Sequence, residues 1–184
     1  MNRQEFIKTC AGGLCTCAIA GNLGTTRLAA EEKPAKDDWR LPFAQARYGK
    51  LLEILTVQLG EAPLTETLRQ LGGFCASGMQ LLAKHKGDVD GFIREFGEKY
   101  GEAISFDREK GIITVVGPER TTCFCPLVDT RTTPKVACNC SLGWQKYVYE
   151  TLLEKPVEVA LKETVLRGGK RCVFEVRIKN NLVG

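Results

Sequence analysis

Apolar residues between positions 39 and 101 recur at the three- and four-residue spacing of amphipathic helices. This spacing predicts a first helix over residues 41 to 59, ended by Gly60. Shorter helices are predicted over residues 63 to 71 and 74 to 86, with the pair Gly72 and Gly73 separating them. A fourth helix is predicted to begin after Asp88, a favourable capping residue, and to end at Gly101.

The pattern changes from helical to extended after Gly101. The stretches AISFD and IITVV, joined by REKG, predict a hairpin, and TTCFC predicts a third strand. A helix is predicted over residues 142 to 154, capped by Asn139 or Ser141. Two strands then follow, VEVALKETVL and RCVFEVRIK, joined by Gly168 and Gly169. This order predicts an α+β fold in which N-terminal helices pack on an antiparallel sheet and the chain ends as a helix and a β-hairpin.

The length of 184 residues, with 43% hydrophobic and 26% charged residues, is typical of one globular domain. Residues 1 to 30 have a charged start, a small apolar run and two closing alanines, which is the layout of a removable export signal. The segment resembles a twin-arginine signal through Arg3 and the FIK that follows, with Gln4 in place of the second arginine. A helix packed on the domain is the alternative.

We therefore expect an export signal over residues 1 to 30, a linker over 31 to 38 and a single α+β ligand-binding-like domain over 39 to 184. The apolar run is too short and too rich in glycine for a stable membrane span. The predicted location is periplasmic, or cytoplasmic if the signal is not functional.

The formal charge of +4 comes from 26 basic and 22 acidic residues, a balance that argues against a nucleic-acid partner. The chain has one histidine, His85, which excludes sites built on two or three histidines. His85 lies between lysines at a predicted helix end, and we interpret it as a solvated residue favoured there by the helix dipole.

The stretch CFCPLVDTRTTPKVACNC carries two Cys-x-Cys pairs separated by twelve residues. Thiolates select zinc, copper(I) or iron–sulfur clusters, and a nearby helix start stabilises them. The predicted ligands of a zinc ion or iron–sulfur cluster are Cys123, Cys125, Cys138 and Cys140, with Cys75 as an additional ligand. Disulfides across the loop, such as Cys123 to Cys140 and Cys125 to Cys138, and free or redox-active thiols remain alternatives. Cys172, on the apolar face of the last strand, is interpreted as a core residue.

The C-terminal half, from the CNC before the helix through EKPVEV and the glycine turn to RCVF, resembles the small-molecule-binding domain named after 4-vinyl reductases. It is also similar to 2-aminothiazoline-4-carboxylate hydrolases, and the resemblance covers residues 73 to 180. The resemblance implies a domain that holds a small-molecule ligand, often with a metal. Because related domains often pair, it also implies a homodimer.

Three functional hypotheses follow. The first is an exported small-molecule-binding domain with a thiolate metal site of structural, sensing or redox role. The second is a hydrolase of the thiazoline type, with Cys140 as nucleophile and Asp129 as proton carrier. The third is a disulfide-stapled secreted binding protein without metal. Trp144 and Arg167 are candidate ligand-binding residues, one as an apolar wall and the other as a partner for a carboxylate.

Overall fold

A computed structural model describes residues 38 to 179 of the chain. The predicted export signal and nearly all of the predicted linker lie outside the described residues, and both stay predictions. The helices are α2 (Arg40–Leu59), α3 (Glu61–Ser77), α4 (Gln80–Lys84), α5 (Val89–Tyr100) and α6 (Cys138–Leu153), with short 3₁₀ turns η1 (Lys135–Ala137) and η2 (Val165–Arg167). The strands are β1 (Ala103–Asp107), β2 (Ile112–Val116), β3 (Val157–Glu163) and β4 (Val173–Ile178).

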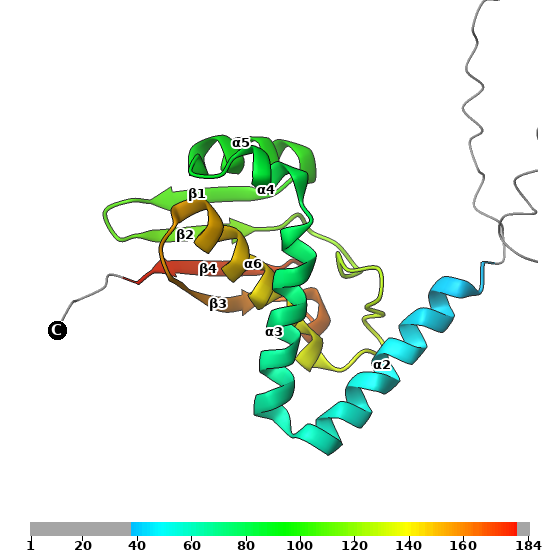
Figure 1. The fold of residues 1–184 in the computed structure, drawn as a ribbon. Helices are drawn as coiled ribbons and strands as arrows, with labels where there is room; N and C mark the ends of the chain where they lie inside the picture. The colour runs from blue at the N-terminus through cyan, green and yellow to red at the C-terminus, as the bar shows by residue number, and fades with distance from the viewer. Residues whose placement is uncertain (1–37, 180–184) are drawn as a thin grey trace, which may run out of the picture. The chain divides into compact units, whose positions relative to one another are not determined.

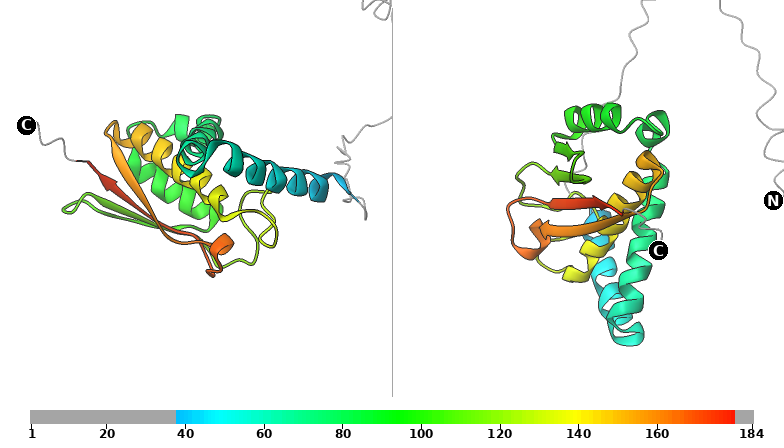
Figure 2. Two further views of the ribbon diagram at one scale, coloured as in Figure 1. Left: turned by 90° about the horizontal axis from the view of Figure 1, so that it is seen from below. Right: turned by 90° about the vertical axis from the view of Figure 1, so that its left-hand side faces the viewer.

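The four strands form one antiparallel sheet in the order β1-β2-β4-β3 (Figure 1). Alternate residues of β2 and β4 are buried, and the register places Ile113 opposite Val176 and Val115 opposite Phe174. These cross-strand apolar pairs give the sheet one face suited to burial. The helices cover that face (Figure 2). The predicted α+β fold, with helices on one side of an antiparallel sheet, is confirmed.

Two apolar clusters fill the space beneath the helices. The larger one joins α4, α5 and α6 to the sheet and contains Phe92, Tyr149 and Val176. The smaller one joins α2, α3, the first residue of α6 and η2, and contains Leu52, Leu64 and Leu166. Both are made of side chains that are almost fully buried, so each holds its elements by the hydrophobic effect. Helix α6 contributes to both clusters and therefore connects the two parts of the core.

Helix α3 does not stop at Gly72 and Gly73, as the sequence predicted, but continues through both to Ser77. A Cβ atom on Gly72 would lie 1.9 Å from the backbone oxygen of Cys140, and one on Gly143 would lie 1.9 Å from the backbone oxygen of Arg69. Each glycine thus lets the backbone of the neighbouring helix approach. The glycine that was interpreted as a helix stop is instead the contact point of α3 with α6.

Two further sequence predictions are corrected by the structure. Helix α6 begins at Cys138, earlier than predicted, because η1 leads directly into it and no side chain caps its start. The stretch TTCFC is not a strand. After β2, the backbone amides of Gly117 and Arg120 donate to the carbonyls of Cys172 and Lys170, and the chain then leaves the sheet as an irregular loop.

His85 is buried rather than solvated, which corrects its interpretation from sequence. Its Nε2 lies 2.7 Å from Glu95 Oε2 and its Nδ1 lies 3.5 Å from Asp88 Oδ2. The same Asp88 caps α5 by accepting a hydrogen bond from Gly91, as predicted. His85 therefore joins the end of α4 to α5, a structural role.

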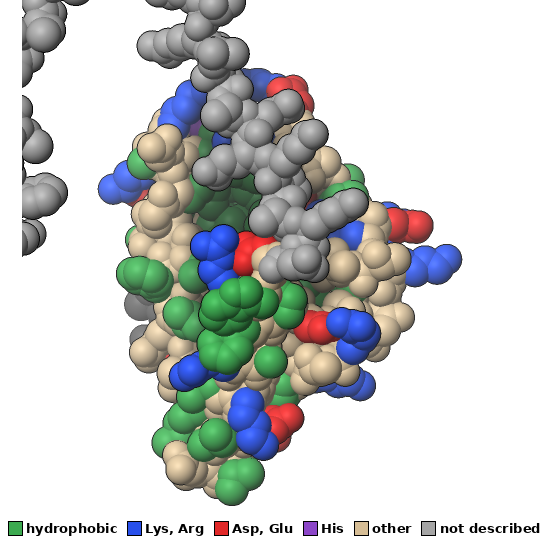
Figure 3. Space-filling view, turned by 90° about the vertical axis from the view of Figure 1, so that its right-hand side faces the viewer, with side chains coloured by type: hydrophobic (Ala, Val, Ile, Leu, Met, Phe, Trp, Pro, Cys, Tyr) green, Lys and Arg blue, Asp and Glu red, His purple; other side chains and the backbone are tan. Residues whose placement is uncertain are grey.

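Helix α2 buries only Gly49 and Leu52. Several of its large apolar side chains are exposed, among them Phe43, Ile54 and Val57, and the last is 86% exposed. Figure 3 shows a face of the molecule on which apolar side chains gather among charged residues of both signs. Among the described helices, none combines the length and apolar character that crossing a membrane requires.

The close contact at Gly72 predicts that adding one methyl group there lowers the stability of the protein markedly. We expect Gly72→Ala to lower the free energy of unfolding by about 1–3 kcal/mol. The added methyl group would clash with the backbone of α6, which cannot rotate away as a side chain can. Gly78→Ala is the matched control, since a Cβ there meets nothing within 4 Å. Chemical denaturation measures both variants. Equal stability of the two would contradict the assigned helix contact.

Candidate functional site

The six described cysteines form two groups, and each Cys-x-Cys pair is divided between them. We define the inner thiol cluster as Cys123, Cys138 and Cys172, because Cys172 and Cys138 raise the pKa of Cys123 and Cys138 raises the pKa of Cys172. We define the outer thiol cluster as Cys75, Cys125 and Cys140, in which the first two raise the pKa of the third. The predicted four-cysteine set thus contributes two residues to each cluster.

The inner thiol cluster lies between the two apolar clusters of the core. Cys138, the first residue of α6, belongs to the smaller apolar cluster, and Cys123 packs against it from the loop. Cys172, immediately before β4, packs against the larger one. Three separate segments therefore meet there, and Cys172 packs against the core as interpreted from sequence.

The turn η2 faces the inner thiol cluster with polar groups. The backbone of Val165 hydrogen-bonds Cys172 and that of Leu166 hydrogen-bonds Cys123, and both contacts lower the pKa of the thiol concerned. Thr164, which caps η2, is buried, and its Oγ1 lies 3.5 Å from Cys138 Sγ. These contacts favour thiolates, because amide donors stabilise negative charge on sulfur.

Burial opposes that effect. It is the largest cause raising the pKa of Cys123 to about 11, with Cys172, Cys138 and, from the outer thiol cluster, Cys125 adding to it. Burial also raises the pKa of Cys172. Without a cation, Cys123 is therefore a neutral thiol at neutral pH. A bound cation would reverse the balance by supplying the charge that three thiolates lack.

Two charged residues near the inner thiol cluster were missed by sequence reasoning. A Cβ on Gly117 would lie 3.6 Å from Glu102 Oε1 and 3.4 Å from the Cys172 carbonyl, so the Glu102 carboxyl lies beside this backbone. Burial raises the pKa of Glu102, and Arg120 lowers it. Both residues also shift the pKa of Cys172. No local motif marks these positions. Arg120 comes near the cluster through the pairing of residues 117 to 120 with residues 170 to 172, and Glu102 through the pairing of β1 with β2.

The outer thiol cluster lies where α3, α6 and the cysteine loop approach α2. Gln45 Nε2 of α2 donates to the Pro126 carbonyl at 2.8 Å, which fixes the loop beside Cys125. One turn further along α2, Tyr48 is close enough to the cluster that Cys140, Cys125 and Cys75 help burial raise its pKa to about 12. Cys75 and Cys125 are exposed, and Cys140 is half-buried.

Cys140 is a protonated thiol at neutral pH. Its pKa is raised to about 11, chiefly by burial, and the neighbouring thiols of Cys75 and Cys125 contribute to the same shift. A nucleophile for the thiazoline-type hydrolysis would need the opposite shift, because the thiolate is the reactive form.

Asp129, the predicted proton carrier, is part of a turn. Its carboxylate accepts hydrogen bonds from the backbone and side chain of Arg131, at 3.0 Å for the amide and 2.8 Å for Nη2. These contacts lower the pKa of Asp129 to about 2. A base with such a pKa is a poor proton acceptor near pH 7. The hydrolase hypothesis gains no support from either residue.

The two predicted ligand-binding residues lie in different settings. Trp144 packs its ring against Phe96 at 5.7 Å between centroids, beside the larger apolar cluster. Arg167 is exposed at the end of η2, on the rim of a shallow hollow of about 280 Å³. Their roles in ligand binding stay predictions.

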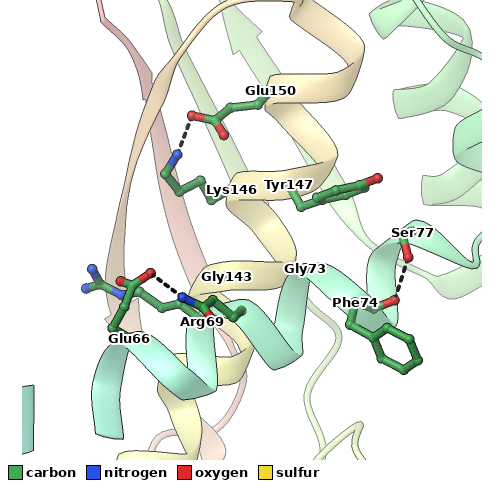
Figure 4. A pocket seen from close by; sticks show the side chains of 10 residues that line it. Glu66, Arg69, Gly73, Phe74, Ser77, Gly143, Lys146, Tyr147 and Glu150 are labelled. Carbon is green, nitrogen blue, oxygen red and sulfur yellow. Dashed lines mark hydrogen bonds and ion pairs between the residues drawn. The ribbon is translucent and has the colours of Figure 1, made fainter. Parts of the chain in front are cut away.

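A larger groove of about 410 Å³ runs between α3 and α6 (Figure 4). Its floor is formed where Gly73 and Gly143 lack side chains, and Phe74 and Tyr147 stand at its side. Lys146 and Glu150 pair within it as an ion pair. Its volume falls in the range of small-molecule pockets, which run from roughly 300 to 1,000 Å³.

As the side chains stand, no three or more His, Cys, Asp or Glu residues between positions 38 and 179 are arranged to hold a metal ion. All six cysteines in that range are free thiols. The suggested bridges from Cys123 to Cys140 and from Cys125 to Cys138 would each join the two clusters. The metal ligands and the disulfide alternative both stay predictions.

Comparison with solved structures shows a shared fold. The phenol-responsive sensory domain of the transcription activator PoxR, with phenol, matches with a TM-score of 0.50 and 13% identity, over 73% of this chain and 74% of that one. A vinyl-4-reductase family protein from Methanocaldococcus jannaschii has a TM-score of 0.40 and 15% identity, over 80% and 86% of the two chains. A trafficking protein particle complex subunit 3 from Naegleria fowleri, covalently bound to palmitic acid, has a TM-score of 0.45 and 16% identity, over 78% of this chain and 98% of that one. No family model and no curated protein matches.

The cluster assignment predicts the order of thiol alkylation in the metal-free protein. We expect iodoacetamide at pH 8 to modify Cys75 and Cys125 first and the buried Cys138 last. Because the pKa of Cys140 is about 11 rather than 9.0, its alkylation rate should rise about tenfold per pH unit up to pH 11. Peptide mass spectrometry over time measures each site. Labelling of Cys138 as fast as Cys125 would contradict the two-cluster arrangement.

Proposed function

We propose that this chain is a small-molecule-binding domain in which the inner thiol cluster binds a zinc ion. The observation that carries the proposal is the meeting of Cys123, Cys138 and Cys172, from three separate segments, opposite the amides of η2. One of these thiols, Cys138, is buried, and the other two are half-buried. A metal ion bound by the three thiolates would cross-link the loop, the start of α6 and the start of β4.

The donor set fits zinc better than an iron–sulfur cluster. Zinc accepts thiolate and oxygen donors in four-coordinate sites, whereas iron–sulfur clusters are commonly held by four cysteines. The inner thiol cluster has three thiols, with the Thr164 hydroxyl and the Glu102 carboxyl nearby as oxygen donors. Metal binding releases the thiol protons and would draw the three sulfurs together, so affinity should fall as pH falls. The bound ion would supply cross-linking of the fold.

The small-molecule role is supported by the fold and by the groove. The PoxR sensory domain, which shares the fold, binds phenol. In this chain the groove between α3 and α6 offers about 410 Å³ with Phe74 and Tyr147 as apolar walls. An aromatic or otherwise apolar small molecule fits these walls best. One wall of the groove is α6, and the same helix begins at Cys138 of the inner thiol cluster. The groove and the proposed metal site therefore share α6.

Export to the periplasm and pairing of two copies stay predictions. Export rests on residues 1 to 30, which lie outside the described part of the chain. Pairing is supported by the exposed apolar side chains of α2, since exposed apolar patches often mark protein contacts.

Serine variants test the metal proposal. We expect Cys123→Ser, Cys138→Ser and Cys172→Ser each to lose zinc, measured by elemental analysis of the purified full-length chain. With cobalt(II) in place of zinc, the same variants should lose the thiolate-to-cobalt charge-transfer absorption that the wild type shows.

The two Cys-x-Cys pairs provide matched controls. Cys125→Ser and Cys140→Ser change the partner cysteine in each pair and should keep the metal. If these two variants lose as much zinc as Cys123→Ser does, the four loop cysteines, and not the inner thiol cluster, are the ligands. Absence of zinc from the wild type after purification and after zinc addition would overturn the proposal.

A further inference from the structure

The outer thiol cluster has no part in the proposed metal site, although it too gathers thiols from distant segments. Cys75 lies on α3, Cys140 on α6 and Cys125 in the loop.

The contact of α3 with α6 places two of these thiols together. At the contact point, Gly72 lies against the Cys140 backbone. Cys75 follows Gly72 by three residues, so it lies near the same side of α3, one turn along. The Cys75 thiol lies near enough to Cys140 to help raise its pKa. Two cysteines that approach each other across a fixed helix pair can be bridged with little backbone movement.

Access to the outer thiol cluster is open from one side. Cys75 is exposed, whereas Cys140 is half-buried and lies near Tyr48 of α2. A solution oxidant therefore reaches the Cys75 sulfur first. The Cys140 thiol, held beside it, is placed to complete the reaction.

We propose that Cys75 and Cys140 are a reversible disulfide site, oxidised by a hydroperoxide, that joins α3 to α6. In the first step the Cys75 sulfur attacks the peroxide, the O–O bond breaks, and a sulfenic acid and one water are produced from hydrogen peroxide. In the second, the Cys140 sulfur attacks the sulfenic sulfur, forming the S–S bond and releasing a second water. Two thiols lose two electrons and two protons in total, and a dithiol reductant reverses the change.

Hydrogen peroxide is the probe, and the full-length chain is treated with it in the presence of a metal chelator. Trypsin separates the relevant cysteines: Cys75 lies in peptide 70 to 84, Cys123 and Cys125 in 121 to 131, and Cys138 and Cys140 in 136 to 146. We expect a linked pair of peptides 70 to 84 and 136 to 146, with fragmentation assigning the bond to Cys140. The link should disappear after dithiothreitol.

Serine variants of three cysteines identify which thiols form the disulfide. Cys125→Ser should form the same link, whereas Cys75→Ser and Cys140→Ser should not. In the wild type, oxidation should raise Tm by several degrees, because a bridge across residues 75 to 140 restricts the unfolded chain, and reductant should reverse the gain. A link through Cys125 or Cys138 in its place, or no link at peroxide concentrations that oxidise Cys75, would overturn the proposal. Because the chelator removes metal, neither result depends on the zinc site.

Discussion

The close contact between α3 and α6 is the constraint on which the cysteine arrangement depends. It exists because Gly72 and Gly143 have no side chains, and a Cβ at either position would lie 1.9 Å from backbone of the other helix. The contact sets where α6 begins relative to α3 and to the sheet. The first turn of α6 contains Cys138 and Cys140. The position of α6 against α3 therefore determines which other thiols lie near each of these two cysteines.

The division of each Cys-x-Cys pair has a geometric reason. Residues two apart on a helix point about 200° apart around its axis, so Cys138 faces the core while Cys140 faces α3 and α2. On the loop, Cys123 packs inward and Cys125 is exposed. Spacing alone makes the four residues look like one site, and their role as a single set of metal ligands stays a prediction. The helix periodicity turns Cys138 and Cys140 toward different neighbours, among which are Cys172 and Cys75 respectively.

The sequence predicted the elements that depend on local pattern. Strands β2 and β4 show their alternation in the residues themselves, and Asp88 caps α5 as its position indicates. It failed where the outcome depends on a distant partner. Gly72 looked like a helix stop because nothing nearby reveals that α6 passes there, and Thr164 and Glu102 carry no motif that links them to cysteines.

The central claim is that the inner thiol cluster, and not the loop alone, binds the metal. Anomalous diffraction at the zinc absorption edge, from crystals of the zinc-loaded protein, tests it most directly. We predict one anomalous peak bonded to the sulfurs of Cys123, Cys138 and Cys172, with no peak among Cys75, Cys125 and Cys140. A peak bonded to Cys123, Cys125, Cys138 and Cys140 together would contradict the account.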